Sequence, residues 1–262
     1  MPVYQILFRD LASPPDLELR TGFANFAAEL IIDIMNLIFA TGNRNKLREA
    51  SEILGEGFEL VTPAEVGLKG DIPETGNSLS ANSLIKAQYI YDSLGKDCFA
   101  DDTGLEVEIL GGAPGINTAR YASPVNDSAA NMAKLLSEMA VRETEASMAR
   151  EYGLDTVHAT RKARFVTIIT LFLGGKTHTF EGIMNGRIAI SQSGVGGFGY
   201  DPVFIPDEVP YYELGAEAPQ DGILLPNWKM LTSSQISEES KNIISHRGKA
   251  LRAMASFLRK EL

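Results

Sequence analysis

Residues 99–107 read FADDTGLEV, an apolar strand pattern interrupted by two adjacent carboxylates and then by a hydroxyl and a glycine. Neighbouring side chains of a strand point to opposite faces of its sheet, so Asp101 and Asp102 cannot both decorate one solvated face. An unpaired buried carboxylate is costly, and at a strand end a hard cation such as Mg2+ is a suitable partner. The stretch therefore indicates a catalytic centre. A strand that ends in a turn is the competing explanation, because Asp and Gly are common turn formers.

The composition is that of an ordinary globular protein, with 262 residues, 44% hydrophobic and 22% charged. No segment approaches the ~18 consecutive apolar residues of a membrane span, and the N-terminus lacks the basic region of a secretory signal. These features predict a cytoplasmic protein. The net charge of −10 argues against a nucleic-acid partner. The single cysteine, Cys98, excludes an intrachain disulfide and predicts a small buried hydrophobic side chain.

Two regions are predicted along the chain. Residues 1–36 are interpreted as an N-terminal extension that is partly disordered up to about residue 15. Residues 37–262 are interpreted as the folded domain. Within this domain the charged segment 141–162 predicts a solvated helical insertion, and the acidic segment 207–232 has no clear periodicity.

A candidate phosphate site follows the first predicted strand. The apolar run at residues 37–40 leads into TGNRNK at 41–46, and residues 47–54 have helical spacing. Free backbone N–H groups and the positive end of a helix attract anions, and Lys46 in the first turn opposes the helix dipole unless a negative group compensates it. The alternative is a plain strand-to-helix turn with a solvated lysine, because the P-loop spacing is absent.

The next segment contains one acidic and one basic candidate, Glu74 and Lys86. Glu74 lies in IPETG at residues 72–76, where a proline and a glycine favour a loop. Lys86 lies on a predicted helix from about residue 79 to 94. Both would be ordinary surface charges in a protein without a site here.

The second half of the chain contains a predicted hairpin and an aromatic loop. Residues 164–173 and 176–183 are strand-like, and Gly-Gly between them suits a two-residue turn. In GGFGYDP at 196–202, Phe198 and Tyr200 either stack on a flat base or anchor the loop in the core. His246 and Arg247 precede the last predicted helix and are candidates to donate hydrogen bonds to a carbonyl or a phosphate.

Six motifs occur in order: ATGNRNK, IPETG, ADDTGLEV, GGAPGINTARY, GGFGYDP and KNIISHRGKA. Together they resemble the inosine triphosphate pyrophosphatases, also called dITP/XTP pyrophosphatases, over about residues 37–258. The resemblance implies an elongated α/β fold with two lobes, a central mixed β-sheet with flanking helices, and a nucleotide cleft. It also implies a homodimer.

The resemblance implies a reaction and its residues. The reaction is Mg2+-dependent hydrolysis of ITP, dITP or XTP to the monophosphate and pyrophosphate, which cleanses the nucleotide pool. Glu74 and Asp102 are implied to bind the metal, with Asp102 as proton acceptor, and Asp101 and Arg120 are left with supporting roles. The residues implied to bind substrate are Thr41, Gly42, Asn43, Arg44, Asn45, Lys46, Lys86, Thr103, Phe198, Gly199, Tyr200, Asp201, Lys241, His246 and Arg247.

The helix after IPETG departs from the family pattern. Residues 80–83 read SANS where the family commonly has an acidic residue followed by Asn-Ala, so a carboxylate that would support the metal is missing. This departure motivates a different hypothesis, a nucleotide-binding protein without catalysis. Because base choice rests on few contacts, a pyrophosphatase for other altered nucleotides is a third hypothesis.

Overall fold

The protein is described from a computed structural model, in which residues 34–70, 72–151, 160–220 and 222–261 are placed well enough to describe. The chain divides into two units, Met1–Met35 and Asn36–Leu262. The elements and sites below belong to the second unit, apart from the first residue of strand β1. The predicted N-terminal extension lies outside the described residues up to residue 33.

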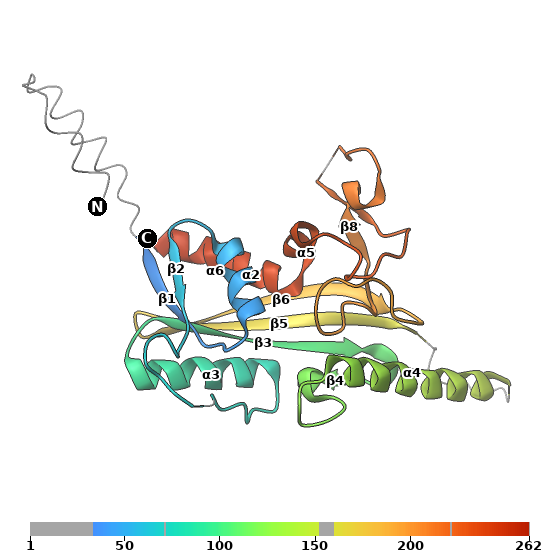
Figure 1. The fold of residues 1–262 in the computed structure, drawn as a ribbon, viewed down its shortest axis with the longest axis horizontal. Coiled ribbons are helices and arrows are strands. Elements are labelled where there is room, and N and C mark those ends of the chain that lie inside the picture. The colour runs from blue at the N-terminus through green and yellow to red at the C-terminus, as the bar shows by residue number, and fades with distance from the viewer. Residues whose placement is uncertain (1–33, 71, 152–159, 221, 262) are drawn as a thin grey trace, which may run out of the picture. The chain divides into compact units, whose positions relative to one another are not determined.

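A seven-stranded mixed sheet forms the centre of the second unit (Figure 1). The strand order is β2-β1-β3-β5-β6-β7, and β4 also pairs with β3. Strand β1 runs parallel to β3, whereas β4 and β5 run antiparallel to it. The strands are β1 (Met35–Phe39), β2 (Phe58–Val61), β3 (Cys98–Val107), β4 (Pro114–Gly115), β5 (Lys162–Leu173), β6 (Lys176–Ile188) and β7 (Phe204–Pro206).

The predicted hairpin is the longest antiparallel pair. Strands β5 and β6 pair from Leu173↔Lys176 to Lys162↔Arg187. Gly174 and Gly175 between them have φ angles of 54° and 77°, which side chains with a Cβ rarely adopt. The two glycines therefore fix the turn and the register of the central sheet.

Helices cover both faces of the sheet, which confirms the predicted α/β class. In Figure 1, α3 lies on one face of the sheet, and α2 and α6 lie on the other. Asn43 caps α2 and Ser78 caps α3, because their side-chain oxygens accept hydrogen bonds from the first turn. The helices are α2 (Arg44–Leu54), α3 (Leu79–Leu94), α4 (Ser128–Glu151), α5 (Glu238–Ile244) and α6 (His246–Glu261), with short 3-10 turns η2 (Glu108–Leu110), η3 (Thr118–Arg120) and η4 (Tyr211–Leu214).

Separate hydrophobic clusters support the two ends of strand β3. One cluster contains Cys98 with Ile90 and Phe172, and burial raises the pKa of the Cys98 thiol to about 12. This agrees with the prediction of a small buried side chain. The other cluster packs Leu105 and the neighbouring strands against α4. The stretch of β3 that carries the acidic pair lies between them.

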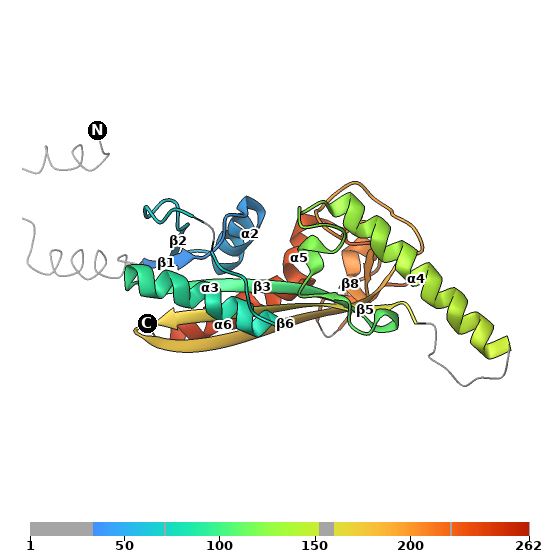
Figure 2. The ribbon, with the colours of Figure 1, turned by 90° about the horizontal axis from the view of Figure 1, so that it is seen from below.

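Two segments differ from the sequence-based interpretation. The first part of the predicted insertion at 141–162 belongs to α4, which continues unbroken to Glu151 over 24 residues (Figure 2). Residues 152–159 lie outside the described residues. Segment 207–232 forms a small two-stranded sheet, β8 (Glu208–Pro210) and β9 (Leu224–Pro226). Strands of three residues are too short to produce a readable alternation.

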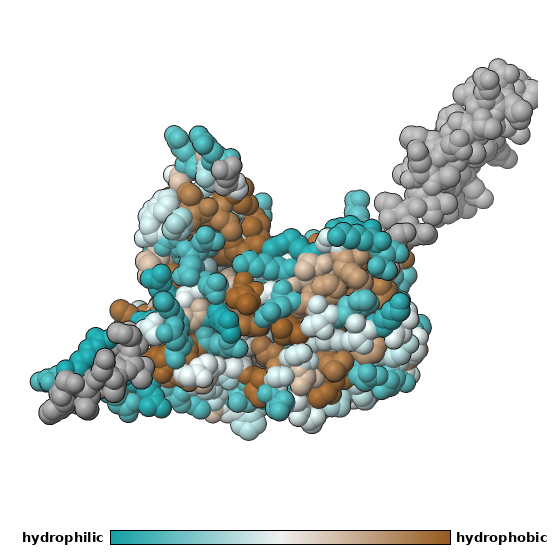
Figure 3. Space-filling model, turned by 180° about the vertical axis from the view of Figure 1, so that it is seen from behind, coloured by the Kyte–Doolittle hydropathy of each residue, from teal (hydrophilic) through white to brown (hydrophobic). Residues whose placement is uncertain are grey.

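The segment with β8, η4 and β9 also exposes large hydrophobic side chains. Figure 3 shows the hydrophobic colour gathered on this projection. The exposed residues here are Tyr212, Ile223, Trp228 and Met230. None of the helices in the described part of the chain has the length and apolar character that crossing a membrane requires.

Gly182 in β6 is predicted to be irreplaceable for packing. A Cβ at this position would collide with the carbonyl oxygen of His246 and come within 2.7 Å of the Ala250 nitrogen, both in the backbone of α6. We expect Gly182→Ala to lower the free energy of unfolding by ~2 kcal/mol or more, because overpacking here displaces a helix. Urea unfolding measures this change.

The matched control is Thr179→Ala, an exposed position on the same strand. Its effect should stay within ~1 kcal/mol, the span of strand propensities. Equal effects of the two substitutions would show that the contact between β6 and α6 is not tight.

Candidate active site

The acidic pair lies in the middle of β3, so its predicted position at a strand end is wrong. Strand β5 pairs along the whole of one edge of β3, from Cys98 to Val107. On the other edge β1 reaches Phe99 and β4 begins at Leu105. Among the described strands, none pairs with residues 100–104 on this edge. The pair therefore lies at a gap in the strand pairing of the sheet, where Asp101 is buried and Asp102 and Thr103 are half-buried.

Asp101 binds two cations on the face of the sheet that α2 and α6 cover. Its side chain is 2% exposed, with Lys46 Nζ 2.9 Å from Oδ1 and Arg247 Nε 2.9 Å from Oδ2. Arg247 also contacts Glu49 Oε2 at 2.5 Å and donates to Thr103 Oγ1 at 3.4 Å. This network of buried charges links α2, α6 and β3.

The charges in this network explain the ionisation of Asp101. Burial by itself would raise the pKa of the carboxyl, but Lys46 and Arg247 outweigh burial and hold the pKa well below its ordinary range. Burial lowers the pKa of Lys46, and Asp101 opposes that effect only in part. Asp101 is therefore a permanent carboxylate that positions two cations, which fits a supporting role.

Asp102 lies on the opposite face of the sheet, toward α3. Lys86 Nζ is 2.8 Å from Asp102 Oδ1 and 3.0 Å from Glu74 Oε1. Arg120 Nη2 holds the second oxygen of Glu74 at 2.9 Å. Asn82 approaches Asp102 Oδ2 at 3.4 Å and accepts a hydrogen bond from the backbone of the IPETG loop, at Gly76, at 2.7 Å. The loop and the helix are thus held together around the two carboxylates.

The pKa values of the two carboxylates are shifted in opposite directions. Burial raises the pKa of Asp102 despite the nearby charge of Lys86. Burial also opposes ionisation of Glu74, but Lys86 and Arg120 hold the pKa of Glu74 below its ordinary value. The shift makes Asp102 a better proton acceptor than an ordinary aspartate, and the opposite shift makes Glu74 a poorer one than an ordinary glutamate.

The donor set fits Mg2+ when substrate supplies the remaining ligands. The described residues contain no group of three or more His, Cys, Asp and Glu side chains arranged to hold a metal. Glu74 and Asp102 nevertheless converge on one ammonium group, so their oxygens face a common point. Protein sites for Mg2+ commonly offer one or two carboxylates and leave the other positions to water and phosphates.

A cavity of ≈ 290 Å³ lies on the face that Asp101 occupies. Ten of the predicted substrate-binding residues line it. Those that line the cavity are Asn43, Asn45, Lys46, Thr103, Phe198, Gly199, Tyr200, Asp201, His246 and Arg247. Lys241 lines a smaller adjoining cavity. Neither cavity is lined by Thr41, Gly42 or Arg44, and the cluster around Asp102 lies outside both.

The aromatic loop has one buried and one exposed ring. Tyr200 is 4% exposed, belongs to the hydrophobic core and donates a hydrogen bond from its hydroxyl to Thr118 O at 3.0 Å. It therefore anchors the loop. Phe198 is 48% exposed at the cavity. Asp201 accepts a hydrogen bond from the Phe198 nitrogen and forms an ion pair with Lys241 at 3.4 Å.

His246 is a neutral residue at the cavity wall. Its ring stacks on Phe165 at 4.7 Å between centroids. Burial and the charge of Arg247 lower its pKa well below the ordinary value. Its Nδ1 is buried and finds no hydrogen-bond partner within the described ranges. Either nitrogen of a neutral imidazole can take part in one hydrogen bond, so the hydrogen-bonding capacity of this atom is unused.

Three polar side chains of the site were missed by the sequence analysis. Glu49 binds Arg247, Asn82 links Asp102 to the IPETG loop, and Thr167 shares a hydrogen bond with Thr103 at 2.7 Å. Glu49 follows Lys46 by three residues and Asn82 precedes Lys86 by four. On a helix, side chains three or four residues apart lie side by side, so this spacing to Lys46 and Lys86 was the signal that could have identified Glu49 and Asn82. Asn82 also supplies a polar contact from the helix where the missing carboxylate was noted.

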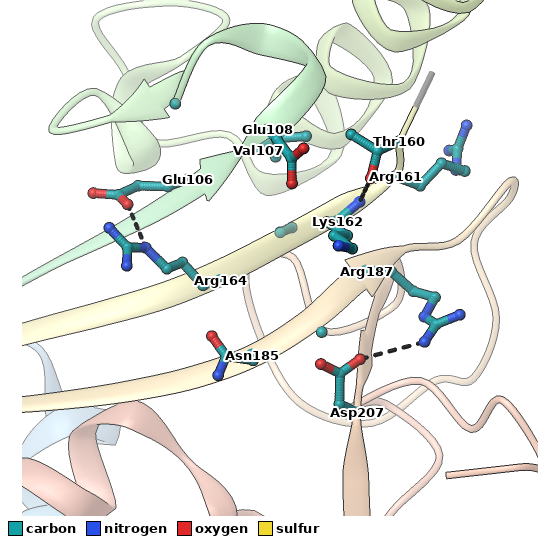
Figure 4. A pocket seen from close by; sticks show the side chains of 13 residues that line it. Glu106, Val107, Glu108, Thr160, Arg161, Lys162, Arg164, Asn185, Arg187 and Asp207 are labelled. Carbon is teal, nitrogen blue, oxygen red and sulfur yellow. Dashed lines mark hydrogen bonds and ion pairs between the residues drawn. The ribbon is translucent and has the colours of Figure 1, made fainter. Parts of the chain in front are cut away.

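A larger hollow lies elsewhere in the described part of the chain. It measures ≈ 960 Å³ and is built on the ends of β3, β5 and β6. In Figure 4, Arg164 points to Glu106 and Arg187 to Asp207, at 2.7 and 3.4 Å. Its charged side chains thus largely neutralise one another, and none of the predicted site residues lines it. It is a weaker candidate than the gap in the sheet.

Comparison with known proteins gives consistent matches over most of the chain. Residues 37–257 match the Ham1 family. A dITP/XTP pyrophosphatase of Flavobacterium psychrophilum is 39% identical over 86% of this chain and 100% of its own. One of Porphyromonas gingivalis is 40% identical over 85% and 96%. The solved Ham1 protein of Staphylococcus aureus superposes with a TM-score of 0.67 and 29% identity, over 87% of this chain and 100% of that one.

Replacing Asp101 should destabilise the fold in a pH-dependent way. In Asp101→Asn, Lys46 and Arg247 lose their buried counter-charge, and we expect the free energy of unfolding at pH 7 to fall by ~3 kcal/mol or more. The pKa of Asp101 is lowered in the folded state. The stability it contributes is therefore present above the unfolded pKa, about 4, and is lost as the pH falls below it.

Urea unfolding at pH 7 and pH 3 tests this, and the difference between wild type and Asp101→Asn should shrink at pH 3. Asp207→Asn is the matched control, because its exposed ion pair with Arg187 should contribute less than ~1 kcal/mol. A difference that is unchanged between the two pH values would contradict the ion-pair explanation.

Proposed function

The chain belongs to the Ham1 family, as its motifs predicted, and on this premise we propose that it hydrolyses non-standard purine nucleoside triphosphates such as dITP, XTP and ITP. The products are the monophosphate and pyrophosphate. The observation that carries the proposal is the pair of charged clusters on successive residues of β3, around Asp101 and Asp102, at the gap in the sheet.

The chain's residues divide the work between the two faces. The loop at 41–46 and the start of α2 present backbone N–H groups and Lys46 to the phosphates. On the other face, Asp102 accepts a proton from water while the water oxygen bonds to the α-phosphorus. The bond from phosphorus to the bridging oxygen breaks, and pyrophosphate leaves. The raised pKa of Asp102 favours this proton transfer.

We assign the metal site to Glu74 and Asp102, with Mg2+ as the ion. When bound, a divalent cation neutralises charge on the phosphates and polarises the phosphoryl group. Arg120 and Asn82 keep the two carboxylates in place, because each contacts one of them. Charge neutralisation by fixed groups is the main requirement of phosphoryl transfer.

The base is proposed to bind in the cavity beside the aromatic loop. The exposed ring of Phe198 is available for stacking on the base. His246 and Arg247 are proposed to read the 6-keto side, and the unpartnered Nδ1 of His246 would gain a hydrogen bond there. An amino group at the same position would leave donors unpaired, which selects against ATP.

The remaining assignments belong to the same proposal. Residues 37–262 form the catalytic domain, and residues 1–36 an extension outside it. The protein is proposed to work as a cytoplasmic homodimer that acts on free nucleotides. The proposal includes no nucleic-acid partner, because the net charge is −10. It includes no membrane partner either.

A substrate panel tests the proposal. Pyrophosphate release from dITP, XTP, ITP, dATP, ATP and GTP is measured with Mg2+ and with EDTA. We expect kcat/KM for the keto purines dITP, XTP and ITP to exceed that for ATP by at least about a hundredfold, and EDTA to remove turnover.

Two other outcomes would decide against the proposal. Tight dITP binding without pyrophosphate release would favour the nucleotide-binding protein that does not catalyse. Preference for a nucleotide outside the keto purines would favour the pyrophosphatase for other altered nucleotides.

Asp102→Asn should remove turnover and leave the fold intact. We expect kcat to fall by at least ~10³-fold, because the variant loses both the proton acceptor and a metal ligand. Asn keeps the size of the side chain, so far-UV circular dichroism should not change. The matched control is Asp92→Asn on the exposed face of α3, which should keep wild-type kcat. An active Asp102→Asn enzyme would remove the proton-acceptor assignment.

A further inference from the structure

We propose that Lys86 is a built-in counter-ion that occupies the metal position of the nucleotide-free protein and must leave it when a divalent cation binds. The inference rests on the proposed function, since it takes Glu74 and Asp102 as the metal ligands. Its basis is the position of one ammonium group, 2.8 Å from Asp102 Oδ1 and 3.0 Å from Glu74 Oε1.

The ammonium and a metal ion cannot share this position. A Mg2+ ion binds carboxylate oxygens at ~2.1 Å, within the space that the Nζ of Lys86 fills. The two positive charges would also repel each other where little water is present, because the Lys86 side chain is 7% exposed. The metal and Lys86 therefore compete for the same two oxygens.

The surroundings allow the ammonium to move without moving the carboxylates. Arg120 holds the other oxygen of Glu74, and Asn82 lies beside the other oxygen of Asp102. Helix α3 is fixed to the sheet through a hydrogen bond between the hydroxyls of Ser83 and Thr170. Only the flexible four-carbon stem of Lys86 has to change its torsion angles. Lys86 keeps its proton and its charge, which becomes available to the phosphates of a substrate.

This exchange predicts weak metal binding in the absence of nucleotide. At rest, Glu74 and Asp102 are balanced by Lys86 and Arg120. A cation entering alone must displace a matched charge, whereas one that arrives with a triphosphate brings a new partner for the displaced ammonium. Lys86 therefore favours the metal–nucleotide complex over the free ion.

The test measures Mn2+ binding to nucleotide-free protein by electron paramagnetic resonance of the free ion. We expect Lys86→Met and Lys86→Gln to bind Mn2+ at least about tenfold more tightly than wild type, because the competing charge is gone. Both variants should lose kcat with dITP. Lys96→Met is the matched control, an exposed lysine just after α3, and should bind Mn2+ like wild type. Near-UV circular dichroism checks the fold of each variant.

Wild-type protein gives a second measurement that needs no variant. Lys86 is almost fully buried and should react slowly with a reductive-methylation reagent, as followed by mass spectrometry of its peptide. Saturating Mn2+ should raise the rate at Lys86 and leave the rate at Lys96 unchanged.

The outcomes separate this inference from the proposed function. If wild type hydrolyses dITP but the Lys86 variants bind Mn2+ no more tightly and labelling does not change, the exchange is wrong and the function stands. If Mn2+ binding in Lys86→Gln persists after Glu74→Gln and Asp102→Asn are added, the metal assignment fails and the exchange fails with it.

Discussion

The buried carboxylate of Asp101 is the interaction on which the site depends. It lies on the central strand and binds Lys46 from α2 and Arg247 from α6, each at 2.9 Å. A buried charge without a partner would destabilise the fold by roughly several kcal/mol. Asp101, Lys46 and Arg247 therefore depend on one another. Their pairing fixes both helix starts against β3. It thereby places the loop at residues 41–46 and the wall of the cavity beside the aromatic loop.

The alternation of side chains along β3 then decides where the chemistry is placed. Because Asp101 faces α2 and α6, Asp102 must face α3. If strands paired with β3 along both of its edges, the sheet would separate the two clusters. They do not, because β1 ends at Phe39 and β4 begins only opposite Leu105. Under the proposed function, this interruption in strand pairing is where one extended ligand reaches both clusters.

Local patterns explain what the sequence predicted correctly. Apolar spacing and the Gly-Gly turn placed α2, α3 and the β5–β6 hairpin close to their observed bounds. The gap beside Asp101 left no such trace, since it depends on pairing with residues 35–39 and 114–115, far away along the chain. The partners of Glu49 and Asn82 were equally hidden, because each partner lies on another element. Strands β8 and β9, of three residues each, are below the length at which alternation is visible.

The charge balance of the site explains how an acidic protein can accept an anionic substrate. Four cations, Lys46, Lys86, Arg120 and Arg247, face four carboxylates, Glu49, Glu74, Asp101 and Asp102. Taken together, these eight ion-paired groups offer a lone triphosphate no net positive charge. Under the proposed function, the added positive charge has to come with the nucleotide as a divalent cation. Under that function, the pairing that stabilises the site also favours a substrate that enters as its metal complex.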